Sequence, residues 1–274
     1  MKDDEIRKVV REGYAQVAKR QSCCCGPADT ADGAPADISR QMGYSDEEMT
    51  SVPEGANLGL GCGNPVALAA LEEGQVIVDL GSGAGFDCFL AAQKVGPLGK
   101  VIGVDMTPDM LDKARANAEA TGVGNVEFRL GEIENLPVAD NTADTIISNC
   151  VINLSPDKHR VFVEAFRVLK PGGRLMVSDI VLLAELPQFI RQSLAAYIGC
   201  ISGAMLKEDY LAAIREAGFA DITIVDEATF PIKLMTNDPT AQAIIKELNV
   251  SDQKAAEIAA SAVSLKVSAI KPKG

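Results

Sequence analysis

The sequence lacks several features that would each point to a class of protein. No run approaches the ~18 apolar residues of a membrane-spanning helix, so we expect no membrane partner. Lys and Arg total 26 against 38 Asp and Glu, a formal net charge of -12. Such a surface repels a phosphate backbone, so we expect no nucleic-acid partner. The seven cysteines include no CxxC pair, which argues against a zinc ribbon and a disulfide framework.

The charged start of the chain, Met1 to Glu5, shows no apolar targeting stretch. Together with an odd, dispersed set of cysteines, this start predicts a soluble protein in a reducing cytoplasm. The composition is 47% hydrophobic and 23% charged, as in packed globular proteins. The 274 residues suffice for one or two domains that need no disulfides.

Strand and helix patterns alternate along the chain. We expect strands at 76–78, 101–104, 126–129, 145–148, 174–178, 222–225 and 262–270. We expect helices at 86–95, 108–120, 159–169, 188–201 and 207–217. Continuous β-branched strands divided by helices predict an α/β fold, a mostly parallel seven-stranded sheet with helices on both faces. Three regions are predicted: a helical and cysteine-loop region over 1–71, a core over 72–183 and closing helices and strands over 184–274.

The predicted N-terminal region contains its own start and stop signals. Apolar residues at helical spacing indicate an amphipathic helix ending near Arg20, followed by an aperiodic loop over 23–35 with three adjacent thiols. Ser45 and Glu48 have capping-box spacing, so a short helix is expected after Ser45. Asn64 suits an N-cap, which places Cys62 in a glycine-flanked turn before another helix.

A glycine-rich loop follows the first expected strand, in the run from Asp79 to Gly85. Its alternating glycines allow a sharp turn and a close backbone approach to a ligand. The next helix directs free N–H groups at an anion, but Phe86 replaces the third glycine of a dinucleotide fingerprint. A smaller anion, such as an amino-acid carboxylate, fits better. Asp105 ends the second strand, where a carboxylate can accept both hydroxyls of a ribose.

With the runs 131–137 and 169–173, this loop resembles the motifs of class I S-adenosylmethionine methyltransferases over residues 72 to 225. The resemblance implies a Rossmann-like fold and S-adenosylmethionine as co-substrate. The cofactor-binding residues that it implies are Asp79, Gly81, Ser82, Gly83, Gly85, Asp105, Met106, Glu132, Ile133 and Asn149. Of these, Met106 is expected to pack on adenine, with Glu132 and Ile133 along the adenine edge.

The acceptor of the methyl group is expected beside residues 149–154, which follow the fourth strand. Methyltransferases that act on exocyclic base amines usually carry the motif N-P-P-[YF] at this place, with an aromatic ring that stacks on the base. This chain has Asn149 and Cys150 there and lacks that aromatic ring. The one histidine, His159, is a general-base candidate that we interpret as a surface residue at a helix start. A nucleophile with its own lone pair needs no base, which favours a soft atom held by thiolates.

The segments around three cysteines strengthen the interpretation that thiolates hold the acceptor. They are residues 58–63, residues 148–154 and Gly199-Cys200. With the N-terminal cysteine cluster, they resemble the arsenite methyltransferases over nearly the full length of the chain. The resemblance implies that Cys62, Cys150 and Cys200 bind trivalent arsenic, from arsenite or methylarsenite, as the substrate. Thiolates suit such a thiophilic centre.

The resemblance also implies a fourth, redox-active cysteine within the triplet Cys23-Cys24-Cys25, for which we choose Cys25. Methylation formally oxidises arsenic by two electrons, and two thiolates can return them by closing a disulfide. Turnover then requires a thiol reductant such as thioredoxin or glutathione. Longer members of the family carry a cysteine-containing C-terminal extension beyond the stretch that corresponds to residues 226–274.

Two other functions are compatible with parts of the pattern. A C- or O-methyltransferase of quinone biosynthesis would use the same glycine loop and Asp105, but would leave the glycine-flanked cysteines unexplained. A metalloid-binding or sensing protein that transfers nothing would have little need for an intact cofactor loop. Cys88, on the helix after that loop, is interpreted as a small buried hydrophobic residue.

Overall fold

The structure is a computed structural model that describes residues 3–20, 35–191, 197, 200–229 and 260–274. Its helices are α1 (Asp3–Arg20), α2 (Pro35–Gln41), α3 (Asp46–Thr50), α4 (Pro65–Leu68), α5 (Phe86–Val95), α6 (Pro108–Thr121), η1 (Ile152–Leu154), α7 (Lys158–Val168), α8 (Gln188–Arg191) and α10 (Lys207–Glu216). Its strands are β1 (Val76–Leu80), β2 (Lys100–Asp105), β3 (Val126–Leu130), β4 (Ala143–Asn149), β5 (Leu169–Leu182), β6 (Ala220–Thr229) and β7 (Ala262–Ile270).

One seven-stranded sheet organises the fold, in the order β3-β2-β1-β4-β5-β7-β6. The strands from β1 to β5 pair in parallel, and β7 runs antiparallel to both β5 and β6. The β-branched run of β1 is almost wholly buried, as expected of a strand covered on both faces. The predicted mostly parallel seven-stranded sheet is therefore confirmed.

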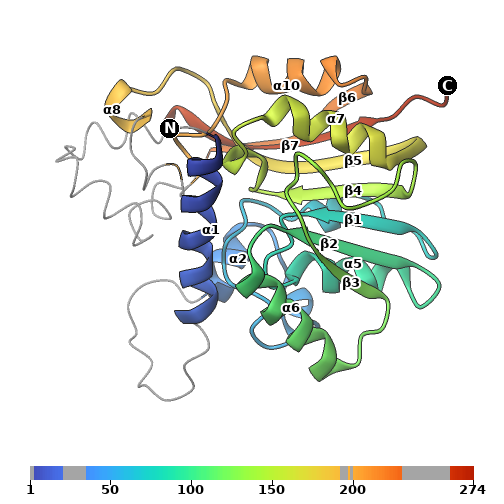
Figure 1. The fold of residues 1–274 in the computed structure, drawn as a ribbon. Helices are drawn as coiled ribbons and strands as arrows, with labels where there is room; N and C mark the ends of the chain where they lie inside the picture. The colour runs from blue at the N-terminus through green and yellow to red at the C-terminus, as the bar shows by residue number, and fades with distance from the viewer. Residues whose placement is uncertain (1–2, 21–34, 192–196, 198–199, 230–259) are drawn as a thin grey trace.

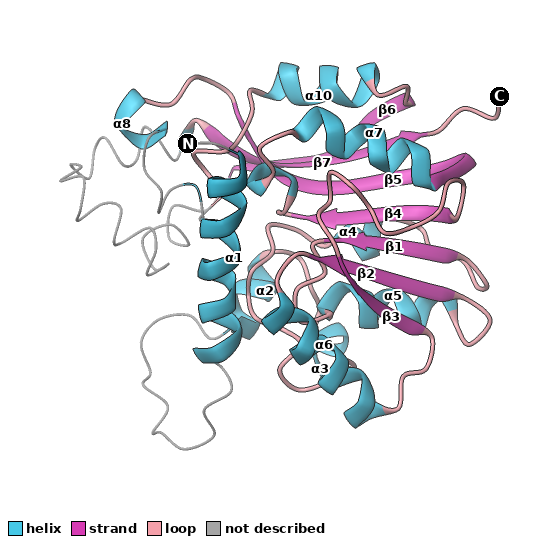
Figure 2. Ribbon diagram, in the orientation of Figure 1, coloured by secondary structure: helices cyan, strands magenta, loops and turns pink. Residues whose placement is uncertain are grey.

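Helices cover both faces of the sheet (Figure 2). On one face, α7 and α10 bury Phe162 and Tyr210, whose rings meet edge to face with centroids 5.3 Å apart. On the other face, α4, α5 and α6 pack around side chains such as Phe89 and Leu111. Each layer buries a continuous apolar core against the sheet, which is the main stabilising contribution to such a fold.

Two predicted elements differ from the observed ones. The expected strand 174–178 is part of a longer strand, β5, which begins at Leu169: Leu169 pairs with Ala143 and Arg174 with Thr145, so the intervening residues form an irregularity in the pairing. A left-handed residue there, Gly172 at φ +82°, allows the backbone to bend. Of the helix expected over 188–201, α8 accounts for 188–191, and much of the remainder lies outside the described residues.

The N-terminal region lies at the carboxyl ends of the parallel strands. There α1 stands across the edge of the sheet at which β1, β2 and β4 end (Figure 1). The predicted capping box is present, because the Ser45 side chain accepts from the Glu48 N–H while the Glu48 carboxylate accepts from the Ser45 N–H. Asn64 caps α4 as predicted, with Pro65 in its first turn. These caps fix the turn that contains Cys62.

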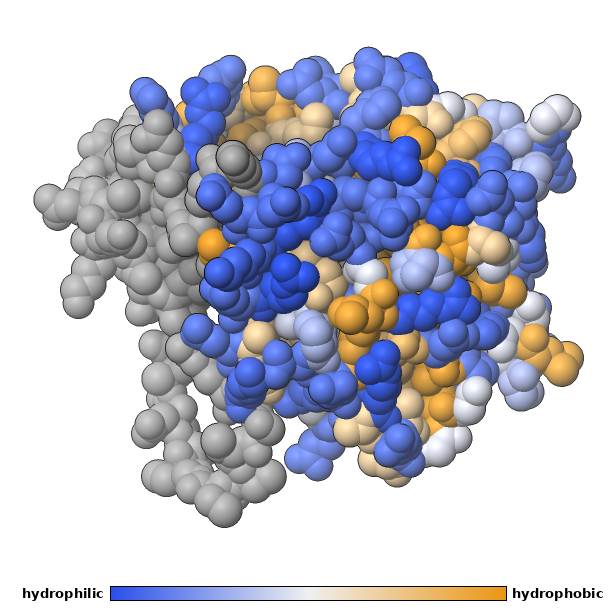
Figure 3. Space-filling view, in the orientation of Figure 1, coloured by the Kyte–Doolittle hydropathy of each residue, from blue (hydrophilic) through white to orange (hydrophobic). Residues whose placement is uncertain are grey.

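The face of the molecule in Figure 3 carries mostly hydrophilic side chains, and hydrophobic residues appear on it in small separate groups. Scattered exposure of this kind is ordinary for a folded protein in water. Among the described residues, no helix combines the length and the apolar character that spanning a bilayer requires.

Candidate functional site

A cavity of about 1110 Å³, part of it open to solvent, lies where β1, β2 and β4 end. The glycine loop and the residues after β4 form one wall, and side chains from α1 and α2, among them Tyr14 and Ile38, form the other. Parallel α/β sheets bind ligands at this edge, since neighbouring crossovers diverge there. We call the wall of Gly81–Gly85 with Asp105 the loop end of the cavity.

The backbone of the loop end depends on glycine. Gly81 and Gly83 adopt left-handed conformations at φ +69° and +51°. A Cβ built on Gly81 would lie 2.3 Å from Val151 Cγ2, whereas a Cβ on Gly83 would meet nothing within 4 Å. Gly81 is thus required by both conformation and space, and the open side of Gly83 leaves room for a ligand against the backbone.

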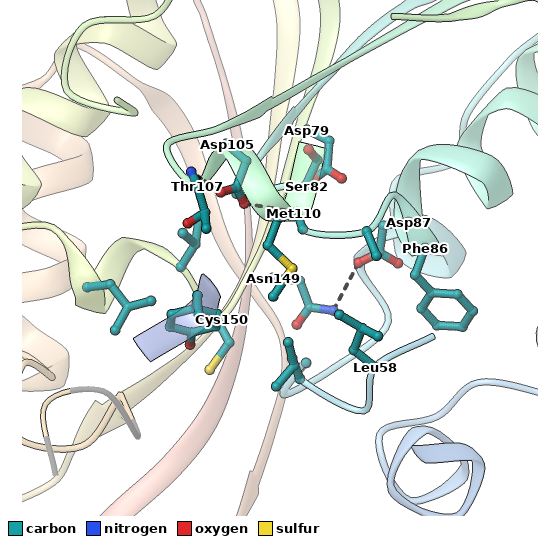
Figure 4. A pocket seen from close by; sticks show the side chains of 18 of the residues that line it. Leu58, Asp79, Ser82, Phe86, Asp87, Asp105, Thr107, Met110, Asn149 and Cys150 are labelled. Atoms are coloured by element: carbon teal, nitrogen blue, oxygen red, sulfur yellow. Dashed lines mark hydrogen bonds between the residues drawn. The ribbon is translucent and has the colours of Figure 1, made fainter. Parts of the chain in front are cut away.

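Asp105 is held by main-chain donors beside this loop. Its Oδ2 accepts from the Gly83 N–H at 3.0 Å and its Oδ1 from the Thr107 N–H at 2.8 Å. The Thr107 side chain and the Met106 main chain also donate to this carboxylate, which lines the cavity as an acceptor for hydroxyl donors. Burial raises the pKa of Asp105, and the N–H donors oppose that shift. Nearby, the buried Ser82 hydroxyl has no hydrogen-bond partner, which marks a place for a polar ligand atom (Figure 4).

Of the three residues predicted to contact adenine, two line the cavity and one does not. Met106 and Ile133 line the cavity, as does Glu134, a residue that the sequence did not single out. Glu132 instead pairs with Arg7 of α1, with its Oε2 3.4 Å from Nε. Glu134 accepts from the Ser155 hydroxyl at 2.7 Å and also pairs with Arg7 at 3.4 Å. The two glutamates therefore tie α1 to the cavity wall.

Asn149 joins the loop end to the turn that carries Cys62. Its Oδ1 accepts from the Cys62 N–H at 2.9 Å, and its Nδ2 lies 3.0 Å from an Asp87 oxygen and 2.9 Å from the Tyr44 hydroxyl. Figure 4 shows this amide between Cys150 and Asp87. The Tyr44 hydroxyl also donates to Asp87 at 2.7 Å. Such a buried, fully bonded network holds its members in one geometry.

Two buried carboxyl groups lie beneath this network. Burial raises the pKa of Asp87 to about 6, while hydrogen bonds from Tyr44 and Asn149 oppose the shift. Burial also raises the pKa of Asp79, with a further contribution from the charge of Asp87. The Cys88 thiol donates to Asp79 at 3.2 Å and is fully buried, in agreement with its interpretation as a core residue.

The fold brings together thiols that are far apart in the sequence. The sulfur atoms of Cys62 and Cys150 and a carboxylate oxygen of Asp179 all lie within 4.8 Å of one another. The Cys200 thiol donates to the Cys150 carbonyl at 3.1 Å. We call these four residues the thiol end of the cavity. All are buried, and Cys150 is the member that lines the cavity itself.

Backbone conformation at the thiol end is unusual. Cys150 and Cys200 adopt left-handed conformations at φ +58° and +61°, which are uncommon for non-glycine residues and occur often at functional sites. Beside Cys62, a Cβ on Gly63 would lie 2.2 Å from Ser178 Oγ, so glycine lets the turn approach β5. Contacts with Cys200 and Cys62, followed by burial, raise the pKa of Cys150 well above its usual range.

Asp179 is a residue that sequence reasoning missed. It lies within β5, but it directly follows the expected strand 174–178, so the rule that singled out the residues after the expected strand 145–148 would have singled it out as well. Its Oδ1 accepts from Asn153 Nδ2 at 2.8 Å and from the Ile180 N–H at 3.1 Å. Its Oδ2 accepts from the Tyr210 hydroxyl at 3.2 Å. Burial raises the pKa of Asp179 to about 7.

Three further residues bear on the predictions. Tyr14 of α1 lines the cavity, and burial followed by contact with Cys200 and Cys150 raises its phenol pKa. His159 lies exposed in the first turn of α7, 3.9 Å from Glu216, and does not line the cavity. That position agrees with its interpretation as a surface residue. Cys25 lies outside the described residues.

Comparisons with known proteins agree with this arrangement. A family model described as a methyltransferase domain matches residues 71–218. An arsenite methyltransferase of Halobacterium salinarum is 49% identical over 237 residues, which cover 82% of this chain and 61% of that protein. Its human counterpart is 36% identical, with the same coverage of each chain. This chain therefore spans about three fifths of the length of these curated relatives.

A solved structure shows the same likeness at the level of the fold. It is the crystal structure of CrArsM, described as an arsenic (III) S-adenosylmethionine methyltransferase from Chlamydomonas reinhardtii. The superposition has a TM-score of 0.62 at 33% sequence identity and covers 86% of this chain and 73% of the other.

Proposed function

The chain belongs to the arsenite methyltransferase family of class I methyltransferases, and on that premise we propose that it transfers a methyl group from S-adenosylmethionine to thiolate-bound trivalent arsenic. The observation that carries the proposal is the group of Cys62, Cys150 and Cys200 at one end of a cavity whose other end fits a nucleoside. Arsenite and methylarsenite are the proposed acceptors.

The loop end offers the groups that S-adenosylmethionine needs. The Asp105 carboxylate lines the cavity as an acceptor for ribose hydroxyls, and the Ser82 hydroxyl lacks a partner that a ligand can supply. Gly81 and Gly83 line the methionine end and bring the backbone close to the ligand, while Met106 and Ile133 provide the apolar surface for adenine. When bound, the cofactor supplies the methyl group as a sulfonium substituent. We propose Glu132 as an outer neighbour that acts through Arg7.

The thiol end offers three sulfur atoms to one soft centre. Replacement of three hydroxyls of arsenite by three thiols releases three waters and gives a neutral complex, which suits a buried site. The left-handed backbone at Cys150 and Cys200 fixes both sulfurs before the ligand arrives. A pyramidal trithiolate keeps the arsenic lone pair free for the methyl group. The chain then contributes alignment of the reacting atoms and exclusion of water. Good alignment lowers the activation free energy by roughly 7–11 kcal/mol.

No general base is needed in this proposal, because the arsenic lone pair carries no proton. The exposed position of His159 is compatible with that expectation. Methyl transfer oxidises arsenic formally by two electrons, and closure of a disulfide between two thiolates returns them. We propose Cys25 as one partner, since the chain from Arg20 to Pro35 connects two helices that both line the cavity. An external thiol, such as thioredoxin or glutathione, then reopens the disulfide.

Release of S-adenosylhomocysteine tests the proposal directly. The parent chain is compared with Cys150→Ser and Cys200→Ser, with and without arsenite and with glutathione present. We expect arsenite-dependent release in the parent and a loss of about a hundredfold or more in both variants, as for loss of a metal-site contact. The matched control is Cys88→Ser, which removes a buried thiol outside the thiol end and should retain arsenite dependence.

Unchanged rates in both thiol-end variants would rule out the arsenic site. Release that needs a quinone-like aromatic instead of arsenite would favour the quinone-biosynthesis alternative. Tight arsenite binding without any release would indicate a metalloid-binding protein.

A further inference from the structure

Asp179 gives the thiol end a donor that trivalent arsenic does not require. Arsenic in three-coordinate form is satisfied by three sulfurs, yet the carboxylate oxygen lies within 4.8 Å of the sulfurs of both Cys62 and Cys150. Hard oxygen donors are typical of divalent cations, whereas soft centres select thiolates. The mixed set of two sulfurs and one oxygen is a ligand set that zinc accepts.

The charge of the site also favours a divalent cation. A trithiolate of arsenic is neutral, so it adds no positive charge to balance the Asp179 carboxylate, which interacts electrostatically with Lys158. Among the ion pairs of the described residues, none includes Asp179. The Lys158 ammonium acts on it through space, while donating to the Ser155 carbonyl at 2.8 Å. A dication held by two thiolates and this carboxylate would carry one net negative charge, opposite that ammonium.

The carboxylate is oriented as metal ligands are. Oδ1 is occupied by two N–H donors, from Asn153 and Ile180. Oδ2 accepts only the Tyr210 hydroxyl among its described contacts, at 3.2 Å, so one lone pair remains. Groups that fix a ligating carboxylate in this way raise the metal affinity of a site. Asp179 thus combines a fixed orientation with an available lone pair beside two thiols.

We propose that Cys62, Cys150 and Asp179 form a site for a divalent cation of the zinc class, which competes with the arsenic acceptor for the same thiols. Binding displaces the two thiol protons to the buffer, and two Zn–S bonds and one Zn–O bond form without any change of oxidation state. The cavity beside Cys150 leaves the fourth position to water. Zinc-bound protein is therefore closed to arsenite.

Cobalt(II) is the probe for the site, because thiolate-to-cobalt charge transfer and tetrahedral d–d absorption report sulfur ligation directly. The background for the binding arm is the full chain with Cys23→Ser, Cys24→Ser and Cys25→Ser, in which the remaining thiols are Cys62, Cys88, Cys150 and Cys200. We expect one equivalent of Co²⁺ to bind with a charge-transfer band and to be displaced by Zn²⁺. Release of about two protons accompanies binding.

Variants assign the ligands. Asp179→Asn keeps an acceptor for Asn153 and Ile180 and should weaken Co²⁺ binding by about tenfold to a hundredfold. Cys62→Ser should abolish the charge-transfer band or halve it, and Cys88→Ser should change neither band nor affinity. Absence of the band in the background chain, or equal Co²⁺ affinity in Asp179→Asn and the background chain, would overturn the proposal.

A competition arm, which rests on the proposed arsenic chemistry, is separate from the binding arm. This arm uses the chain with Cys23, Cys24 and Cys25 intact, in which Zn²⁺ should raise the apparent KM for arsenite at unchanged kcat, and less so when Asp179→Asn is introduced there. Loss of arsenite-dependent activity in every condition would contradict the proposed function but leave the cobalt result standing. Inhibition by Zn²⁺ that lowers kcat at unchanged KM would contradict the shared site.

Discussion

The loop end and the thiol end share one cavity but are built in different ways. The loop end comes from one segment, Gly81 to Asp105, in which glycine conformation and main-chain donors shape the binding surface. The thiol end gathers Cys62, Cys150, Asp179 and Cys200 from four separate elements. Cys150 follows β4 and Asp179 lies within the neighbouring β5, and the turns that contain Cys62 and Cys200 pack against them. The comparison teaches that cofactor binding is encoded locally here, whereas acceptor choice is encoded by the fold.

The sharpest test of this contrast concerns the loop end. Gly81→Ala places a Cβ 2.3 Å from Val151 Cγ2 at φ +69°, whereas Gly83→Ala adds one in open space at φ +51°. We expect Gly81→Ala to cost about 2–5 kcal/mol of unfolding free energy from overpacking and left-handed strain, and Gly83→Ala about 1–2 kcal/mol from strain alone. Urea unfolding of the two variants measures the difference, and equal costs would contradict the packing argument.

A second test addresses the connection between the two ends. Asn149→Ala removes the acceptor of the Cys62 N–H and a donor to Asp87. The buried partners left unpaired should cost about 2–4 kcal/mol in unfolding free energy. The thiol end loses the contact that holds the Cys62 turn, and the loop end loses the contact with Asp87. We therefore expect the KM for S-adenosylmethionine and the KM for arsenite to rise together. Ser82→Ala, which alters the loop end alone, is the matched control and should raise only the first.

The loop end was predictable from the sequence to a greater extent than the thiol end, because it is formed by one local segment. The loop from Asp79 to Gly85, the strand before it and the helix after it were predicted from local spacing, and the structure has all three. Cys62, Cys150 and Cys200 were selected through a resemblance, since nothing in their spacing shows that they meet. Asp179 was overlooked although it directly follows the expected strand 174–178, and only the packing of Asn153 and Tyr210 shows how its carboxylate is held. Similarly, no local pattern shows that Glu132 pairs with Arg7.

A third test uses the buried carboxyl group of Asp87. The folded state holds its proton up to about pH 6, while the unfolded chain releases it near its ordinary pKa of 3.8. Folding is therefore linked to proton uptake in this interval, and stability falls as pH rises through it. We expect Asp87 to contribute on the order of 2–3 kcal/mol to the loss of stability between pH ~4 and pH ~6.5, beside the losses from Asp79 and Asp179, whose pKa values burial also raises.

Asp87→Asn should remove the contribution of Asp87 and leave a shallower dependence from Asp79 and Asp179, as measured by urea unfolding at a series of pH values. Asp112→Asn, at an exposed carboxylate of α6, is the control and should keep the slope of the parent. The same pH slope in Asp87→Asn as in the parent would show that this carboxyl group is not the source. The thiol end would then hold the groups responsible, and the comparison between the two ends would need revision.

The smallest expected effect concerns α1, which closes the cavity over both ends. Arg7 pairs with Glu132 and Glu134 at 3.4 Å, and its side chain is only 17% exposed. Arg7→Met keeps the apolar stem but removes these ion pairs, which should cost about 0.5–1 kcal/mol at low salt. Lys8→Met, at the exposed neighbour that lies 3.9 Å from Glu12, should cost less.

Limited proteolysis within α1 measures this effect, because local opening exposes the helix before the sheet unfolds. We expect faster cleavage in Arg7→Met than in Lys8→Met, because Lys8→Met keeps the ion pairs of Arg7. The difference between the two cleavage rates should become smaller at high salt, which screens these ion pairs. Bound S-adenosylmethionine should slow cleavage in all three chains, since Arg7, Val10 and Tyr14 line the cavity that it would fill. Protection by arsenite but not by S-adenosylmethionine would instead place α1 over the thiol end alone.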